Sequence, residues 1–321
     1  MSRHLLSRLA VLSVIAISSF QATNASSNPL ADGWYQYQVP LAENTGSPCC
    51  QVDGASQTCT LASSPQNLHI DKSLSSETLV IYFKQNAQAV EDIVLAGQQC
   101  QVDTGTSPVK RLTNWSVAQS LEMLQSLSSG SDHHLATMAI AAIALHRDTE
   151  ATEALVNIAF DAQHEDQRDA IFWLGEARQR DGYAHLRRLI DTESLSVKTR
   201  KHAVFALSLS THPAALDTLS ALARGYPTAQ IQKEAIFWYA EHKGHNPTPL
   251  LLDLTGPAYP RSIQKEAVFG LSRLPGSLAT DALTTLVRDT QSRTVRESAM
   301  FWLGQSKDPK AFKFLTEILT K

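Results

Sequence analysis

The chain has 321 residues, of which 43% are hydrophobic and 18% are charged, and its formal net charge at pH 7 is −3. This composition is typical of a globular protein with enough apolar residues for a large core. The mild negative charge, together with basic residues that do not cluster into a stripe, argues against nucleic acid as the natural partner.

The first 25 residues predict a secretory signal peptide. Arg3 and Arg8 flank the start of a short apolar run over 9–17, and the small residues at 23–25 offer a cleavage site after Ala25. The run is far shorter than the roughly 20 residues that a membrane span needs, so we expect no transmembrane segment in the mature chain. Cleavage would remove two arginines and no acids, which moves the charge from −3 to −5. The sequence therefore predicts an exported protein, periplasmic or secreted.

Residues 28–110 predict a small β-rich domain. The segments 34–39, 78–83 and 89–95 are rich in β-branched and aromatic residues, and Gln85-Asn86 offers a turn before the last of them. Glycine, serine and proline crowd the stretch between the first two segments, where no further element is predicted.

All four cysteines lie in this β-rich region, at Cys49, Cys50, Cys59 and Cys100. An even number of cysteines behind an export signal predicts two disulfides. A bridge between the neighbours Cys49 and Cys50 would be strained, so two pairings with the other two cysteines stay open. A metal site is the weaker alternative, because the spacing lacks a CxxC pair.

Residues 112–321 predict an α-solenoid, made of a capping helix and about six helix pairs. Ser116 can cap a helix that runs through Leu127, and the segments 134–145 and 149–160 form a degenerate first pair. Asp308-Pro309 is a good start for the last helix, with an N-cap acid and a proline in the first turn. The segment 246–255 carries two prolines, so its helix should be short.

A five-residue phrase with a central phenylalanine returns five times in this part of the chain. The phenylalanines are spaced by 33, 32, 32 and 32 residues and lie at Phe172, Phe205, Phe237, Phe269 and Phe301. A fixed period of this length indicates a stacked repeat protein, in which each unit buries its apolar face only against its neighbours.

The segments 263–272 and 295–304 resemble HEAT repeats, and most closely the short type called phycobilisome-lyase-like HEAT repeats. The resemblance covers roughly residues 133–321 and implies an α-solenoid whose repeated phenylalanine faces the concave surface. It implies no activity, since a fold does not fix a function. The front part also resembles exported bacterial HEAT-repeat proteins of unknown activity, in which a Trp-aromatic segment precedes a Cys-Cys pair and a Cys-x-x-Asp, here 100–103.

Each repeated phenylalanine lies on an otherwise polar helix face, so the rings should form a ladder along one side of the solenoid. Two interpretations stay open: the rings pack into the seams between repeats, or they form an exposed stripe that binds an extended or helical segment of another protein. The pairs Lys233-Glu234 and Lys265-Glu266 recur beside them, either as a solvated face or as a rim that sets specificity. The next position alternates between large and small, which indicates packing; its residues are Trp173, Ala206, Trp238, Gly270 and Trp302.

The sequence shows no convergent catalytic constellation. The histidines are scattered, and the single His164-Glu165 pair contrasts with the several such pairs of HEAT-repeat di-iron hydroxylases of the deoxyhypusine type. We therefore predict a non-enzymatic scaffold that binds a protein or peptide and needs no cofactor or metal. Two alternatives are kept: a metal-dependent or lyase-type enzyme that uses histidines where the two parts of the chain meet, and an envelope sensor that binds through its N-terminal domain.

Overall fold

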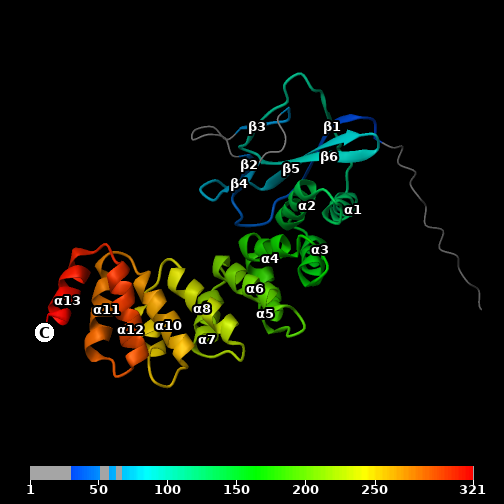
Figure 1. Cartoon of the computed structure of the whole chain (residues 1–321). Helices are drawn as coiled ribbons and strands as arrows, with labels where there is room; N and C mark the ends of the chain where they lie inside the picture. Colours follow the sequence, from blue (N-terminus) through cyan, green and yellow to red (C-terminus); the bar gives the residue numbers. More distant parts are fainter. Residues whose placement is uncertain (1–29, 51–57, 63–66, 321) are drawn as a thin grey trace, which may run out of the picture.

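The structure is a computed structural model that describes residues 30–50, 58–62 and 67–320. A β-rich part leads into a long row of helices, as the sequence predicts (Figure 1). The predicted signal peptide, residues 1–25, lies outside the described residues. Among the helices that are described, none combines the length and the apolar character that crossing a membrane requires.

Four strands form the main sheet, in the order β6-β5-β1-β8. The bounds are β1 Gly33–Pro40, β5 Thr78–Asn86, β6 Ala89–Gly97 and β8 Val109–Arg111. The three longest are the strands predicted from the sequence, and they pair antiparallel. Ala87 and Gln88 form the β5–β6 turn with positive φ angles of 46° and 69°, as expected of a two-residue hairpin. The short β8 instead pairs parallel with β1.

Four shorter strands, which the sequence analysis did not find, form two separate ribbons. β2 pairs antiparallel with β4, and β3 pairs parallel with β7. Their bounds are β2 Ser47–Cys50, β3 Thr58–Thr60, β4 Leu68–Asp71 and β7 Gln101–Asp103. A small apolar cluster that includes Trp34, Val94 and three of the cysteines lies between these ribbons and the main sheet.

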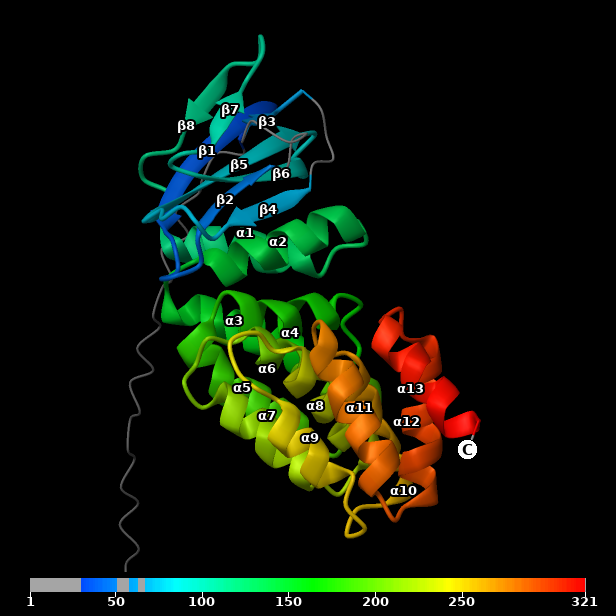
Figure 2. The ribbon, with the colours of Figure 1, turned by 90° about the vertical axis from the view of Figure 1, so that its left-hand side faces the viewer.

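The opposite face of the sheet packs against helices α1 (Val117–Ser128) and α2 (His133–Leu145), which lie between the sheet and the remaining helices (Figure 2). Tyr35 stacks on Phe83 at 5.4 Å, and the cluster of sheet residues is continuous with the helical core. Backbone hydrogen bonds from Ala42 to Leu145 and from Arg147 to Pro40 add a direct link. The predicted regions 28–110 and 112–321 therefore share one core.

Beyond α2, the chain continues as helices that follow one another in pairs. Their bounds are α3 Thr149–Phe160, α4 Gln167–Glu176, α5 Gln179–Asp191, α6 Val197–Leu209, α7 Ala215–Arg224, α8 Ala229–Glu241, α9 Thr248–Leu254, α10 Arg261–Ser272, α11 Ser277–Asp289, α12 Arg293–Gln305 and α13 Pro309–Leu319. With α2, the described residues make six helix pairs, and the predicted α-solenoid is confirmed. The first helix of each later pair carries the repeated phenylalanine, and we call α4, α6, α8, α10 and α12 the motif helices.

Local signals set several helix ends where the sequence predicts them. Ser116 and Gln119 form a capping box at the start of α1. The Asp308 carboxylate accepts a hydrogen bond from the Lys310 amide at 2.9 Å, and Pro309 opens α13. Helix α9 has only seven residues and starts after Pro247, as its two prolines indicate.

The motif helices pack on one another along the row, whereas successive second helices make sparse mutual contact. The motif helices therefore form the more closely packed of the two helix layers. One approach is very close: a methyl group added at Gly175 of α4 would lie 2.0 Å from the carbonyl oxygen of Ala206 in α6. Only glycine fits there.

Candidate partner-binding face

Eight aromatic rings form one continuous row along the motif helices, which we call the ring row. Its neighbours lie 4.6–6.4 Å apart between ring centroids. In spatial order the row contains Trp173, Phe172, Phe205, Trp238, Phe237, Phe269, Trp302 and Phe301. The sequence analysis expected a ladder of five phenylalanines; the structure adds the three tryptophans as links within it.

The alternation of large and small residues sets how the rings meet. Phe172 stacks on Phe205 at 6.4 Å, and Phe237 stacks on Phe269 at 6.2 Å; in both cases the second repeat has a small residue at the next position. Where that residue is a tryptophan, its ring takes the contact instead, as Trp238 does with Phe205 at 4.6 Å. The two kinds of interface alternate along the stack.

The ring row is half-buried along most of its length. Phe172, Phe205, Phe237 and Phe269 are each intermediate in exposure, while Phe301 at the end of the row is 57% exposed. Each ring therefore contacts a neighbour through one part of its surface and leaves another part accessible. The rings thus pack into the seams between repeats and at the same time form a partly exposed stripe.

The charged residues beside the ring row connect adjacent repeats. Lys201 Nζ of α6 lies 2.8 Å from Glu234 Oε2 of α8, and the indole N–H of Trp238 donates to Glu234 Oε1 at 2.9 Å. One repeat further, burial raises the pKa of Glu266 above its usual range, and the nearby Lys233 opposes that shift. Lys265 is exposed. These lysines and glutamates thus form a mixed-sign border along the rings.

Two hollows lie along the ring row. One, of about 500 Å³, is lined by Phe269, Phe301 and Trp302 together with polar residues that include Lys265 and Glu266. The other, of about 440 Å³, is lined by Phe172 and Phe205 together with His133, His202 and several charged residues. Both combine aromatic and charged residues in their lining.

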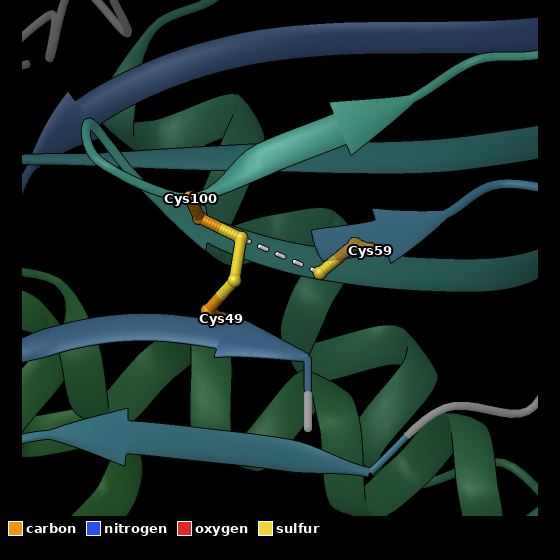
Figure 3. Close-up of side chains that lie close together, drawn as sticks. All are labelled: Cys49, Cys59 and Cys100. Atoms are coloured by element: carbon orange, nitrogen blue, oxygen red, sulfur yellow. Dashed lines mark hydrogen bonds between the residues drawn. A yellow bond between two sulfur atoms is a disulfide. The ribbon is translucent and has the colours of Figure 1, made fainter. Parts of the chain in front are cut away.

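The four cysteines form two disulfides, as predicted, and the pairing is nested. Cys49 bonds to Cys100 and Cys50 bonds to Cys59. The two bridges touch, with Cys59 Sγ 3.6 Å from Cys100 Sγ (Figure 3). All four sulfur atoms are used in these bonds, and a metal ligand requires a thiolate. The cluster therefore joins the ribbon β2–β4 covalently to the ribbon β3–β7 and is not a metal centre.

A buried polar network at the junction of the sheet and the helices was not found from the sequence. The Tyr37 and Ser120 hydroxyls lie 2.7 Å apart, Ser120 Oγ lies 2.9 Å from His146 Nε2, and His146 Nδ1 lies 3.4 Å from Asp148 Oδ2. Serine, histidine and aspartate in this order occur in nucleophilic triads. Here, however, Ser120 and His146 have no exposed surface, so a substrate has no access to them.

This network instead joins β1, α1 and the segment after α2, and burial lowers the pKa of His146. Its members are up to 83 residues apart in sequence, so no local sequence pattern indicates that they meet. Of the other histidines, His164 accepts a hydrogen bond from the Asp166 amide through Nδ1, in the loop that precedes α4.

Comparison with known proteins agrees with the repeat geometry. The family model described as the PBS lyase HEAT-like repeat matches residues 295–321, which form most of the pair α12–α13. The same helix-pair unit recurs along the row from α2. The chain is a HEAT-like repeat protein. A search of curated proteins finds no significant match.

Several solved structures are similar to part of this HEAT-like repeat protein. Human deoxyhypusine hydroxylase in complex with glycerol is 15% identical, with 63% of this chain and 79% of that chain covered and a TM-score of 0.33. YibA of Escherichia coli is 14% identical, with 64% and 76% covered and a TM-score of 0.35. The CpcE–CpcF complex of phycocyanin lyase from a Nostoc species is 14% identical, with 61% and 92% covered and a TM-score of 0.27.

Proposed function

We propose that this protein is an exported scaffold that binds a segment of another polypeptide along the ring row. The observation that carries the proposal is the continuity of the row: eight rings, each in contact with the next, follow one another along the motif helices. An extended or helical peptide laid along this face would bury the accessible parts of several rings at once. Burial of apolar surface is the main source of affinity at such grooves.

The charged border supports a polypeptide as the partner. Lys201 contributes a positive charge beside the rings and Glu234 and Glu266 contribute negative ones, so no single-sign field attracts a polyanion. Such a border selects among peptides through the arrangement of their charges, because like charges brought together cost affinity. The rings supply affinity, and the border supplies specificity.

Export is part of the same proposal. The two disulfides support it, because structural disulfides persist in oxidising compartments. Sequencing of the N-terminus of the protein recovered from the cell envelope tests it directly. A mature chain that begins after Ala25 is expected, and an uncleaved cytosolic chain would overturn this part of the proposal.

The binding proposal is tested by substitutions at exposed rings, where stability is least affected. Phe301→Ala removes the most exposed ring of the row, and Phe312→Ala is the matched control, because Phe312 is 75% exposed on α13 and its ring takes no part in the ring contacts that build the row. Proteins crosslinked to the tagged chain in the native envelope would be quantified by mass spectrometry. We expect Phe301→Ala to deplete a specific partner while Phe312→Ala retains it, with both melting temperatures near that of the unaltered chain.

A second variant tests whether the result depends on Phe301 alone. Phe269→Ala opens the same hollow from its other wall and should deplete the same partner. If both ring variants retain every crosslinked protein, the ring row serves packing alone. Deletion of residues 28–110 is not a suitable test of the sensor alternative, because it would expose the sheet-covered faces of α1 and α2 to water.

A further inference from the structure

A buried arginine without an ionic partner lies where α4 meets α5. Arg178 is only 6% exposed, and its Nη2 donates a hydrogen bond to the carbonyl oxygen of Ile143 at 2.9 Å. Its Nε is also buried and has no acceptor among the described residues. No carboxylate of the described chain forms an ion pair with this guanidinium. A charge removed from water in this way is costly unless an anion completes its environment.

The charge of Arg178 persists at neutral pH. Burial lowers its pKa to about 10, and Asp181 and Asp148 counteract the shift only from a distance. The Ile143 carbonyl belongs to the last turn of α2, where the negative end of a helix dipole offsets part of a positive charge. This compensation is only partial, because Nη2 is the only nitrogen of the Arg178 guanidinium with a hydrogen bond among the described residues.

Arg178 lines a hollow of about 730 Å³ between the loop after β1 and the starts of α5 and α7. Arg147 and Arg180 line the same hollow, and both are exposed. Arg178 is also the N-cap residue of the 13-residue helix α5, whose first turn faces this region without a side-chain cap. The acids in the lining are Glu43 and Asp181, both exposed. The three arginines of the lining outnumber these two acids, and the position of Arg178 is fixed by its burial.

We propose that this junction pocket, lined by Arg147, Arg178 and Arg180, binds a phosphate group, either free or as the monoester of a small molecule. Guanidinium forks match the oxygens of phosphate, and helix N-termini stabilise the same group. A phosphate dianion offers the three guanidiniums one more oxygen and one more negative charge than a carboxylate does, so it matches this set of cations better. The pocket shares no lining residue with the hollows of the ring row, so the proposal is independent of peptide binding.

The test is isothermal titration of the purified full chain at pH 7.5 and constant ionic strength, with inorganic phosphate, phenyl phosphate and acetate as probes. Phosphate or phenyl phosphate should bind, and acetate should bind at least tenfold more weakly. Tighter binding of phenyl phosphate identifies a monoester as the ligand class, and tighter binding of inorganic phosphate identifies the free ion. Absence of binding by both phosphate probes, or acetate binding as tightly as either, overturns the proposal.

Arg180→Gln is the decisive variant, because Arg180 is exposed and its loss should leave the fold intact. We expect it to weaken phosphate binding about tenfold, the effect of losing about 1.4 kcal/mol of contact energy. Arg261→Gln, an exposed arginine at the start of α10, is the matched control and should bind as the unaltered chain does. At the same phosphate concentration, the melting temperature of the control should rise more than that of Arg180→Gln. Equal affinities of the two variants would refute the site.

Discussion

Replacing Gly175 by alanine tests the close approach of the first two motif helices. The added methyl group would lie 2.0 Å from the carbonyl oxygen of Ala206, and contacts below 3.0 Å are essentially never adopted by real side chains. The obstacle is backbone, so no rotamer change relieves it, and α6 must move away from α4 by about 1 Å. Separation on that scale also loosens the stacked pair Phe172–Phe205, because the two rings belong to these helices.

The chain contains its own control for this change. Gly304 occupies the same position of the repeat in α12, also next to the last residue of its helix, and a methyl group added there has nothing within 4 Å. Replacement of glycine by alanine in a helix gains up to about 1 kcal/mol at either position. The difference between the two variants therefore isolates the cost of overpacking, which we expect to be about 1–3 kcal/mol.

The assay is urea denaturation followed by circular dichroism at 222 nm, with the disulfides kept oxidised. We expect Gly304→Ala to unfold at or slightly above the urea concentration of the unaltered chain, and Gly175→Ala clearly below it. In thermal melts the two should differ by several degrees, at about 2–4 °C for each kcal/mol in a chain of this size. Equal stability of the two variants would show that α4 and α6 do not meet at Gly175.

Further predictions concern the rest of the core. Loss of the Cys49–Cys100 bridge, which spans 51 residues, should lower the free energy of unfolding by about 4 kcal/mol in the chain-entropy relation. Loss of the Cys50–Cys59 bridge, which spans nine residues, should lower it by about 2.6 kcal/mol. Urea midpoints of variants in which both cysteines of a bridge are replaced by serine would measure both effects. Burial lowers the pKa of His146 from its ordinary 6.5, so below that pH the unfolded chain binds more protons than the folded chain. The free energy of unfolding should therefore fall between pH 7 and pH 5, and it should fall less in His146→Gln. Gly270→Trp should cost about 1–3 kcal/mol in the same assay, since even a methyl group there would lie 3.1 Å from the side chain of Leu251.

The helical part could be predicted because each of its signals is local or periodic. The repeated phenylalanine fixed the period, Ser116 and Asp308 marked helix starts, and the prolines near 247 indicated the shortened α9. The three long strands were likewise visible as β-rich segments. Each of these features depends on residues within a few turns of one another, so one sequence was enough.

The features that the sequence did not reveal all depend on distant residues. The ribbons β2–β4 and β3–β7 join segments that are individually too short to show a pattern, and the choice between the two disulfide pairings depends on how those ribbons lie. The network around His146 joins residues from both parts of the chain. Trp238 and Trp302 enter the ring row through contacts with Phe205 and Phe269 of the preceding repeat, and one sequence does not show which rings of neighbouring helices meet.

Because the sheet and α2 share one core, the end of the stack next to the sheet should resist local opening more than the far end does. A repeat in the middle of the array is held only by its neighbours, but α2 is held on one side by α4 and on the other by β-structure that two covalent bridges reinforce. Opening α2 would require both to yield. Amide protons of α2 should therefore exchange with deuterium most slowly, with protection declining towards α12, and the motion that a bound peptide suppresses should be concentrated far from the sheet.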